Sequence, residues 1–365
     1  MHLFLLAGEP SGEQHAARLV KALREIWPDV RLSGTGGPAM KAAGVDLILE
    51  LEQMNFMGFV EVVKHVGRIR ENFRRVKQHL KANRPDAVIL VDYPGFNLRM
   101  ARWCHRQGFR VIYYIAPQVW AWKESRVRTL RKFCDLVLCI LPFEEEYFRT
   151  HGVKAFFVGH PLADTAFEVP SESARMGLAL FPGSRPFEVR NLLPVMLEAA
   201  VHLGEKDVTL AVPEGFDRGL YAPYLGTSSL KVHFCSSDEA LAQARYAFVK
   251  SGTSTLQAAL HNVPFLVVYK GHLLSYWIAL RLVKVPFVSL VNLLAGREVV
   301  REFLQHQVTV ENLVDEGRKI RDDASYRQRQ VENFAQIRKL LAGGLHAQRA
   351  AQRIADFLSV QPTAN

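Results

Sequence analysis

Short apolar runs alternate with longer amphipathic segments along most of this chain. Runs such as "HLFLLA", "AVILVD", "RVIYYI" and "DLVLCIL" show no polar alternation, which is typical of parallel strands covered on both faces. The amphipathic segments between them fit the helices of successive βαβ units. This rhythm stops at residues 163–177 and restarts with "LALFPGSR", "VTLAVPEG" and "YAFVKSGTS". We therefore expect an α/β fold in which a linker joins two doubly wound parallel-sheet domains.

Composition and net charge narrow the classes of partner that such a fold could bind, but they do not select one class. The 365 residues are 49% hydrophobic and 22% charged, which is the composition of globular domains and excludes a disordered or fibrous chain. A formal net charge of +10 favours an anionic partner: nucleic acid, a phosphorylated small molecule or an anionic membrane. The apolar runs are too short to span a bilayer, the first lacks the basic flank of a signal peptide, and the four cysteines form no CxxC pair. The expected location is therefore the reduced cytoplasm.

An acidic residue directly follows one of the buried strands. In "AVILVDYPGFN", residues 87–91 read as the strand and Asp92 stands at its carboxyl end. Ligands of open α/β sheets bind at that edge, so Asp92 is a candidate functional residue. The turn "AGEPSGE" after the first strand has two glycines ahead of a helix, but its spacing fits neither a dinucleotide fingerprint nor a P-loop. Both segments could also be ordinary structural turns, because Asp commonly caps a turn ahead of Pro-Gly.

Two strand-turn-helix segments in the second half have features of anion sites. In "ALFPGSRPFEV", Gly183, Ser184 and Arg185 precede a helix that has Pro186 at its first position. A helix start beside a guanidinium suits a phosphate or diphosphate, although a single Arg on a loop is more often solvated. The segment "SGTSTLQ" gathers hydroxyl groups at another helix start, where ordinary capping needs only one. No DxD motif stands at a strand end, so we expect no bound metal.

Two basic segments offer surfaces for an anionic partner. The segment "NFMGFVEVVKHVGRIRENFRRVKQHL" gives a helix an apolar arc bordered by Arg70, Arg74 and Lys77. Such a helix either packs on its own sheet or lies on anionic lipid. The segment "APQVWAWKESRVRTLRKF" sets Trp120 and Trp122 beside a basic helix. That pattern fits nucleic acid, a lipid headgroup layer or tryptophans that cap the core.

Taken together, the motifs resemble those of one known family. The set "AGEPSGE", "MGFVEV", "VDYPGFN", "YYIAPQVWAW", "LPFEEEYF", "VGHPLAD", "FPGSR", "SGTSTLQ" and "NLLAGRE" resembles lipid-A-disaccharide synthase, a bacterial glycosyltransferase family of the GT-B architecture. The likeness runs in order from Leu5 to Leu304. It implies two Rossmann-like domains facing a central cleft: residues 1–165 for the acceptor and the membrane, and residues 166–340 for the UDP-sugar donor. Residues 341–365 would form a C-terminal helix, which in many GT-B proteins crosses back onto the first domain.

The resemblance also implies a reaction and its residues. UDP-2,3-diacylglucosamine would donate its sugar to the 6-hydroxyl of 2,3-diacylglucosamine 1-phosphate, giving a β-1′,6-linked disaccharide phosphate and UDP with inversion and without metal or cofactor. The enzyme would be a cytoplasmic monomer or homodimer, peripherally attached to the anionic inner membrane and without a nucleic-acid partner. The implied catalytic residues are Asp92 as general base, Arg185 and Glu9; those of the nucleotide site are Gly183, Ser184, Arg185, Ser251, Gly252, Thr253, Gln257 and Asn292; those of the acceptor site or cleft are Ser11, Gly12, Asn97 and His160; and those of the membrane face are Phe59, Val62, Val63, Val66, Ile69 and Phe73.

The sequence departs from the family pattern at two positions, and it is compatible with two alternative functions. Gln257 stands where relatives usually have a Glu that grips the ribose hydroxyls, so we expect weaker, neutral hydrogen bonds to the donor. Glu13 stands where Asp is more usual. A GT-B enzyme acting on another UDP-sugar, such as an epimerase or a transferase with a non-lipid acceptor, would explain the second-half motifs equally well. A basic nucleic-acid-binding protein would explain the net charge but not the three strand-turn-helix segments, whose glycines and helix starts suit an anionic ligand.

Overall fold

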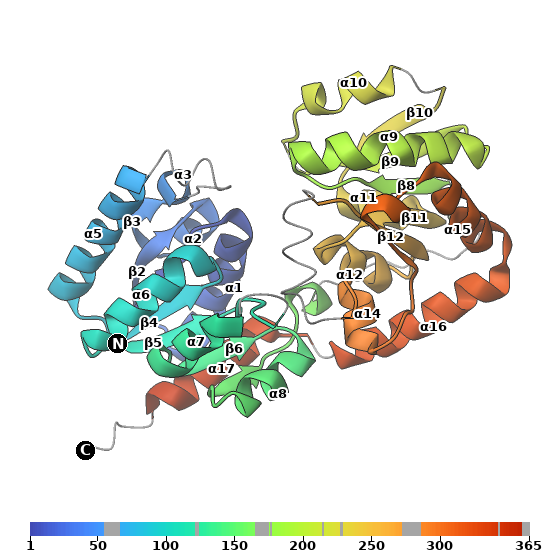
Figure 1. The fold of residues 1–365 in the computed structure, drawn as a ribbon. Coiled ribbons are helices and arrows are strands. Elements are labelled where there is room, and N and C mark those ends of the chain that lie inside the picture. Colours follow the sequence, from blue (N-terminus) through green and yellow to red (C-terminus); the bar gives the residue numbers. More distant parts are fainter. Residues whose placement is uncertain are drawn as a thin grey trace. The chain divides into compact units, whose positions relative to one another are not determined.

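The computed structural model describes residues 1–54, 66–120, 124–164, 175, 177–213, 215–226, 229–271, 286–341 and 344–359. They form two compact units (Figure 1). Unit 1 comprises Met1–Asp164 and Gly343–Asn365, and unit 2 comprises Thr165–Ala342. The chain therefore leaves unit 1, completes unit 2 and returns to unit 1 with its last helix.

The described part of unit 1 contains a seven-stranded parallel sheet in the order β3-β2-β1-β4-β5-β6-β7. Its strands are β1 (His2–Leu6), β2 (Arg31–Gly36), β3 (Asp46–Glu50), β4 (Ala87–Val91), β5 (Arg110–Tyr114), β6 (Leu136–Cys139) and β7 (Ala155–Phe157). Its helices are α1 (Pro10–Ile26), α2 (Pro38–Ala42), α3 (Leu51–Met54), α5 (Val66–Asn83), α6 (Pro94–Arg106), α7 (Val127–Phe133), α8 (Pro142–Thr150) and α17 (His346–Ser359), with short 3₁₀ helices η1 (Glu124–Arg126) and η2 (Pro161–Asp164). Strand β1 pairs with both β2 and β4, so the strand order reverses between β1 and β4.

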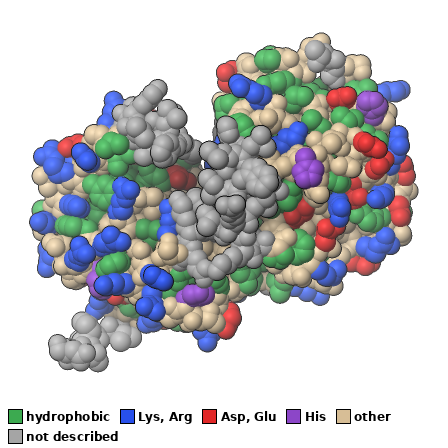
Figure 2. Space-filling view, in the orientation of Figure 1, with side chains coloured by type: hydrophobic (Ala, Val, Ile, Leu, Met, Phe, Trp, Pro, Cys, Tyr) green, Lys and Arg blue, Asp and Glu red, His purple; other side chains and the backbone are tan. Residues whose placement is uncertain are grey.

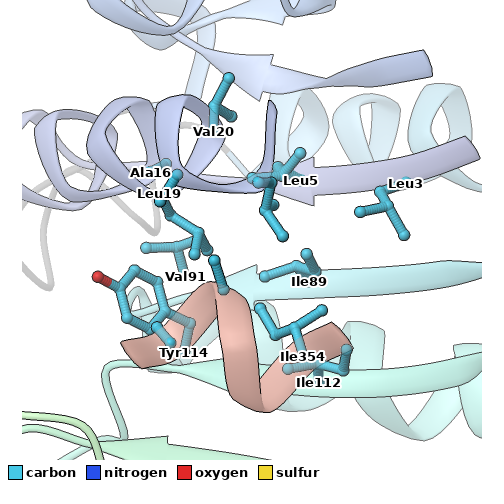
Figure 3. Close-up of a cluster of buried hydrophobic side chains, with 14 of the residues drawn as sticks. Leu3, Leu5, Ala16, Leu19, Val20, Ile89, Val91, Ile112, Tyr114 and Ile354 are labelled. Carbon is cyan, nitrogen blue, oxygen red and sulfur yellow. The ribbon is translucent and has the colours of Figure 1, made fainter. Parts of the chain in front are cut away.

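Both faces of this sheet are covered by helices, as its continuous apolar strands require. Strand residues such as Leu3, Leu5 and Ile89 form a buried cluster with α1, α2 and α17 (Figure 3). The alternate strand residues, such as Phe4 and Val88, form a second cluster with α5, α6, α7 and α8. The last helix belongs to the first cluster because its apolar residues recur at helical spacing: Ala347, Ala350, Ala351, Ile354 and Leu358 are all buried.

The described part of unit 2 contains a six-stranded parallel sheet in the order β10-β9-β8-β11-β12-β13. Its strands are β8 (Leu178–Phe181), β9 (Asp207–Ala211), β10 (Lys231–Cys235), β11 (Tyr246–Lys250), β12 (Phe265–Tyr269) and β13 (Glu302–Leu304). Its helices are α9 (Pro186–His202), α10 (Ala222–Leu225), α11 (Ser237–Gln243), α12 (Thr253–Leu260), α14 (Leu290–Ala295), α15 (Val310–Asp322) and α16 (Ala324–Leu340), with 3₁₀ helices η4 (Arg218–Leu220) and η5 (Gln305–Gln307). Strand β8 pairs with β9 and β11, so this order also reverses at its first strand. The predicted α/β fold of two doubly wound parallel sheets is confirmed.

Candidate active site

In unit 1 the predicted turn and the predicted acid meet where the strand order reverses. Glu9 follows β1 and directly precedes α1, whose first residue is Pro10. Asp92 follows β4, the neighbour of β1. A Cβ placed on Gly8 would lie 2.3 Å from the ring of Tyr93, and one placed on Gly12 would lie 3.9 Å from the Cβ of Asp92. The two turns therefore pack directly on each other at the carboxyl edge, the place where doubly wound sheets bind ligands.

The backbone at Asp92 is held in an unusual conformation by several hydrogen bonds. Asp92 and Tyr93 both have positive φ angles, 45° and 46°, a conformation that costs about 1–3 kcal/mol for each non-glycine residue. The carbonyl of Asp92 accepts hydrogen bonds from the Asn97 side-chain amide at 2.8 Å and from the Tyr113 hydroxyl at 2.6 Å. Its N–H donates to the carbonyl of Tyr114 at 3.0 Å. Because these bonds use the main chain of Asp92, they fix the residue without using its carboxylate.

The Asp92 carboxyl group has the proton affinity of a base that works near neutral pH. Burial, with a smaller contribution from the negative charge of Glu9, raises its pKa to about 6, while a backbone hydrogen bond from Tyr93 opposes the shift. A carboxylate with such a pKa is ionised at pH 7 yet accepts a proton more readily than an ordinary Asp. The arrangement can therefore remove a proton from a bound hydroxyl group.

The remaining predicted residues of unit 1 have different surroundings. Ser11 is exposed and Gly12 is buried. Asn97 is completely buried, and its amide also donates to the carbonyl of Val91 at 3.1 Å, so it supports the turn from beneath. His160 is buried as well, its Nδ1 accepts a hydrogen bond from the N–H of Leu162 at 3.2 Å, and burial lowers its pKa to about 3, which keeps the ring neutral.

In unit 2 the predicted turn at the start of α9 carries an internal anion. Gly183 has a φ of 98°, and a Cβ there would lie 2.3 Å from Oε2 of Glu188. The N–H groups of Ser184 and Arg185 donate to that same oxygen at 3.2 and 3.4 Å. The other carboxylate oxygen of Glu188 lies 2.8 Å from Nζ of Lys250, the last residue of β11. The helix start thus already binds one carboxylate, while the Arg185 side chain is exposed.

The second predicted turn lies beside the first, because β8 and β11 are neighbours. The Ser251 hydroxyl donates to the carbonyl of Val288 at 2.7 Å, and Thr253 is exposed at the first position of α12. Gly252 has a φ of 150°, a conformation open chiefly to glycine. Ser251, Gly252 and Thr253 therefore lie at the carboxyl edge of the sheet, next to the start of α9.

Two further predicted residues are engaged within the unit. The Gln257 amide donates to Oδ1 of Asp238 at 2.6 Å. Asn292 is completely buried; its oxygen accepts from the N–H groups of Val299 and Val300, and its nitrogen donates to the carbonyl of Val300 and to Glu302. A contact between Asn292 and a nucleotide stays a prediction, and it would have to replace one of these bonds.

The sequence assigned no site role to three charged residues at the edge of this sheet. Lys250 and Glu188 form the partly buried ion pair described above, and Asp238 accepts the Gln257 hydrogen bond. Lys250 could have been found by the signal that marked Asp92, a charged residue at the carboxyl end of a buried strand. The ion pair of Glu188 and the hydrogen bond of Asp238 each connect segments that are far apart in the sequence. No local sequence pattern could therefore predict them.

The predicted membrane face is only partly within the described residues. Phe59, Val62 and Val63 lie outside them. Val66 is 40% exposed, while Ile69 and Phe73 are half-buried. The ring of Phe73 stacks on that of Phe96 with centroids 3.8 Å apart, so Phe73 also belongs to the core.

A basic groove lies between α5 and α6. This α5–α6 groove has a volume of about 610 Å³, and its lining residues are Arg70, Phe73, Arg74, Lys77, Gln78, Lys81, Arg99 and Trp103. The ammonium of Lys77 lies 5.7 Å from the ring centroid of Phe73 and 5.4 Å from that of Trp103, at cation–π distance. Figure 2 shows Lys and Arg side chains spread among hydrophobic ones over the face of unit 1 that carries these helices. The groove can therefore accept an anion against an aromatic wall.

The predicted aromatic and basic surface around Trp120 and Trp122 is only partly within the described residues. Trp120 is buried and its indole N–H donates to Glu144 at 2.8 Å, so this tryptophan caps the core; Trp122 lies outside the described residues. Within the described ranges, no helix combines the length and the apolar character that crossing a bilayer requires. The same residues contain no group of three or more His, Cys, Asp or Glu side chains positioned to hold a metal ion.

Known proteins resemble this chain along nearly its whole length. Residues 3–355 match the family model described as lipid-A-disaccharide synthetase. The chain is 37% identical over 380 residues to a lipid-A-disaccharide synthase of Myxococcus xanthus, with 98% of this chain and 97% of the relative covered. It is 38% identical over 355 residues to that of Anaeromyxobacter dehalogenans strain 2CP-1, with 93% of each covered.

Solved structures show a similar fold at low sequence identity. UDP-GlcNAc 2-epimerase from Neisseria meningitidis matches with a TM-score of 0.64 and 12% identity, over 98% of this chain and 100% of that one. The calicheamicin glycosyltransferase CalG4 matches with a TM-score of 0.60 and 18% identity, over 100% of this chain and 99% of that one. At such identities these likenesses establish the architecture alone.

Proposed function

Because this chain belongs to the lipid-A-disaccharide synthase family and is a glycosyltransferase of the GT-B fold, we propose that it joins two acylated glucosamines in an inverting transfer. The donor is UDP-2,3-diacylglucosamine and the acceptor is 2,3-diacylglucosamine 1-phosphate. The products are the β-1′,6-linked disaccharide 1-phosphate and UDP. Unit 1 serves the acceptor and the membrane, and unit 2 serves the donor.

The observation that carries this proposal is the half-buried carboxyl group of Asp92, with its pKa raised to about 6, at the carboxyl end of β4. In a single displacement the 6-oxygen of the acceptor attacks the anomeric carbon of the donor while the bond from that carbon to the diphosphate oxygen breaks. The bonding electron pair leaves with UDP, and the hydroxyl proton passes to Asp92. Burial and, to a smaller extent, the charge of Glu9 keep the pKa of Asp92 high, and the hydrogen bonds of Asn97 and Tyr113 hold the turn.

Departure of UDP requires stabilisation of the negative charge that grows on the diphosphate. We assign this to the exposed Arg185 guanidinium and the starts of α9 and α12, which point positive helix ends at the carboxyl edge of the sheet. Their charge takes the role that a divalent metal has in other glycosyltransferases, and the sequence offers no strand-end DxD to hold one. Ser251, Gly252, Thr253 and Gln257 complete the proposed nucleotide site.

The proposal includes peripheral attachment to an anionic membrane through α5 and the α5–α6 groove. Helix α5 carries a single acidic residue, Glu71, against six Lys and Arg, and α6 carries none. The exposed Val66 stands at the start of the same helix. Apolar and basic side chains on one helix are the features of an interfacial segment, and attachment there would bring the enzyme to its lipid substrates.

The test is disaccharide formation by the wild-type enzyme and by Asp92→Asn. Both would receive radiolabelled 2,3-diacylglucosamine 1-phosphate and UDP-2,3-diacylglucosamine in detergent micelles with EDTA. We expect product from the wild type and a loss of at least about 100-fold in turnover for Asp92→Asn, which keeps the shape of the turn but cannot accept the proton. Near-normal turnover in the variant would remove Asp92 as the base. If a folded wild type releases UDP from UDP-N-acetylglucosamine but forms no lipid disaccharide, the lipid acceptor assignment is wrong. The enzyme would then act on another UDP-sugar.

A further inference from the structure

We propose that Lys250 is a ligand of the donor's diphosphate and that Glu188 occupies only one of the three donors of its ammonium. The inference rests on the proposed function, because it names a further residue of the donor site. Lys250 ends β11, directly ahead of Ser251 and Gly252, at the strand edge where the order of the sheet reverses. The charge therefore stands at the place where doubly wound sheets bind ligands.

The position of the ammonium is fixed by its surroundings. The Lys250 side chain is 23% exposed and that of Glu188 is 11% exposed, and Nζ lies 2.8 Å from Oε1 of Glu188. The same Nζ lies 3.7 Å from the point where a Cβ on Gly252 would stand. Through the other oxygen of Glu188, the pair is joined to the N–H groups of Ser184 and Arg185. The ammonium is thus placed next to the starts of both α9 and α12.

Glu188 leaves the ammonium able to bind a second anion. A lysine ammonium has three N–H donors, and the bond to Glu188 uses one of them. A carboxylate that bridges an ammonium and two backbone N–H groups has the geometry of an anion bound at a helix start, so the site is already arranged for oxygen anions. At the starts of α9 and α12, the two positive charges of Lys250 and Arg185 outweigh the negative charge of Glu188, which leaves the ammonium and the guanidinium an excess for the diphosphate.

A purely structural ion pair is the competing explanation. Partly buried ion pairs add little stability because desolvation offsets most of their attraction, so stability alone gives this pair no clear purpose. The two explanations also predict different behaviour. A structural pair is broken equally by neutralising either partner, whereas a diphosphate ligand depends on Lys250 and not on the charge of Glu188.

The experiment is isothermal titration of the full-length protein with UDP and with uridine. We expect Lys250→Gln to bind UDP at least tenfold more weakly and to bind uridine as the wild type does, because only the phosphate contact is lost. Glu188→Gln keeps a hydrogen-bonding oxygen and the ammonium, and should bind UDP within about threefold of the wild type. Lys250→Arg should recover most of the affinity. Lys231→Gln, which removes an exposed lysine at the first residue of β10, should change neither ligand.

The outcomes separate this inference from the proposed function. Equal weakening by Lys250→Gln and Glu188→Gln, or equal weakening of UDP and uridine, would show that the pair is structural. Unchanged UDP binding in Lys250→Gln would overturn the inference while leaving the donor site intact. Failure of the wild type to bind UDP would instead remove the donor assignment itself. If Lys250→Gln unfolds, the double variant Glu188→Gln/Lys250→Gln replaces it, because it leaves no unpaired buried charge. We expect this double variant to lose affinity for UDP and to keep its affinity for uridine.

Discussion

At the scale of single residues, two carboxyl groups share the edge of unit 1 and only one of them is proposed to take the proton. A general base must be deprotonated, so activity should fall as the pH drops through the pKa of Asp92, at about 6. Burial is the larger cause of that raised pKa and the charge of Glu9 the smaller. Glu9→Gln removes the negative charge, so we expect it to lower the pKa of Asp92 and to move the acidic limb of the rate profile to lower pH by less than one unit.

The measurement is kcat/KM from pH 4.5 to 8 for the wild type, Glu9→Gln and Glu9→Asp. The Asp variant keeps the charge and should keep the limb near its original position. A limb that stays in place in Glu9→Gln would show that Glu9 does not act on Asp92 through its charge. A limb that moves to higher pH would show that another group controls the rate.

The sequence predicted the residues at these edges better than their partners. Asp92 and the turn at Gly183 could be found because a strand end and a helix start leave local signals. The pairing of Lys250 with Glu188, and of Gln257 with Asp238, joins segments that only the folded sheet brings together. The amide of Gln257 can donate to Asp238, which the carboxylate of a Glu at the same position could not do.

At the scale of elements, the proposed attachment of α5 to lipid makes a quantitative prediction. Arg70, Lys77 and Lys81 line the α5–α6 groove, and each basic residue near an anionic surface contributes about 1 kcal/mol to binding. Changing all three to Gln should weaken binding to vesicles containing phosphatidylglycerol by roughly 100-fold, because about 3 kcal/mol is lost. Vesicle sedimentation at low and high salt measures the change.

The control replaces three exposed cations of unit 2, Arg318, Lys319 and Lys339, with Gln and alters the net charge equally. We expect this control to keep nearly all of its binding. Equal losses in both variants would mean that overall charge, rather than the groove, draws the protein to lipid. Equally tight binding of the wild type to neutral phosphatidylcholine vesicles would contradict an electrostatic contact altogether.

The helical pattern predicted α5 but not what its faces contact. Val76, which lies one turn after the predicted face residue Phe73, is completely buried, and Phe73 stacks on Phe96. The groove needs Arg99 and Trp103 from α6 as its second wall. Periodicity describes one helix at a time, so it could neither separate the core-facing residues from the exposed Val66 nor reveal a groove made by two helices.

At the scale of the whole molecule, the two units differ in how the chain builds them. Unit 2 is one continuous segment, and its hydrophobic cluster draws on residues between Leu178 and Ile320. Unit 1 is complete only after α17 has packed against α1. The sequence indicated two sheets and a last amphipathic helix, but an apolar stripe does not say which sheet it will cover.

Hydrogen bonds connect the segment that leaves unit 1 with the segment that returns to it. Asp164, the last residue of η2, accepts hydrogen bonds from the backbone N–H of His346 at 3.2 and 3.1 Å, and its carboxylate also contacts the His346 ring. The departing and returning segments of the chain therefore lie side by side within unit 1. A short linker could therefore connect these two segments directly in a chain that lacks unit 2.

This arrangement predicts opposite behaviour for fragments of the two units. Residues 165–342 should fold alone with a cooperative urea transition and bind UDP, since they contain their own core and the proposed donor site. Residues 1–164 alone should be poorly stable, because they leave the apolar face that α17 covers exposed (Figure 3). Burying the six apolar side chains of α17 contributes several kcal/mol, at about 1.5–3 kcal/mol each for Ile354 and Leu358, which is comparable to the whole stability of a domain.

Joining residue 164 to residue 344 through a short Gly-Ser linker should restore a cooperative transition to unit 1. The same chain carrying Ile354→Asp, which buries an unpaired charge beside Leu3 and Ile89, is the matched control and should remain unstable. Stable folding of 1–164 without α17 would show that the helix is an accessory and not part of the core. UDP bound by the joined unit 1 and not by residues 165–342 would reverse the assignment of donor and acceptor to the two units, because the nucleotide then belongs to the edge that carries Asp92.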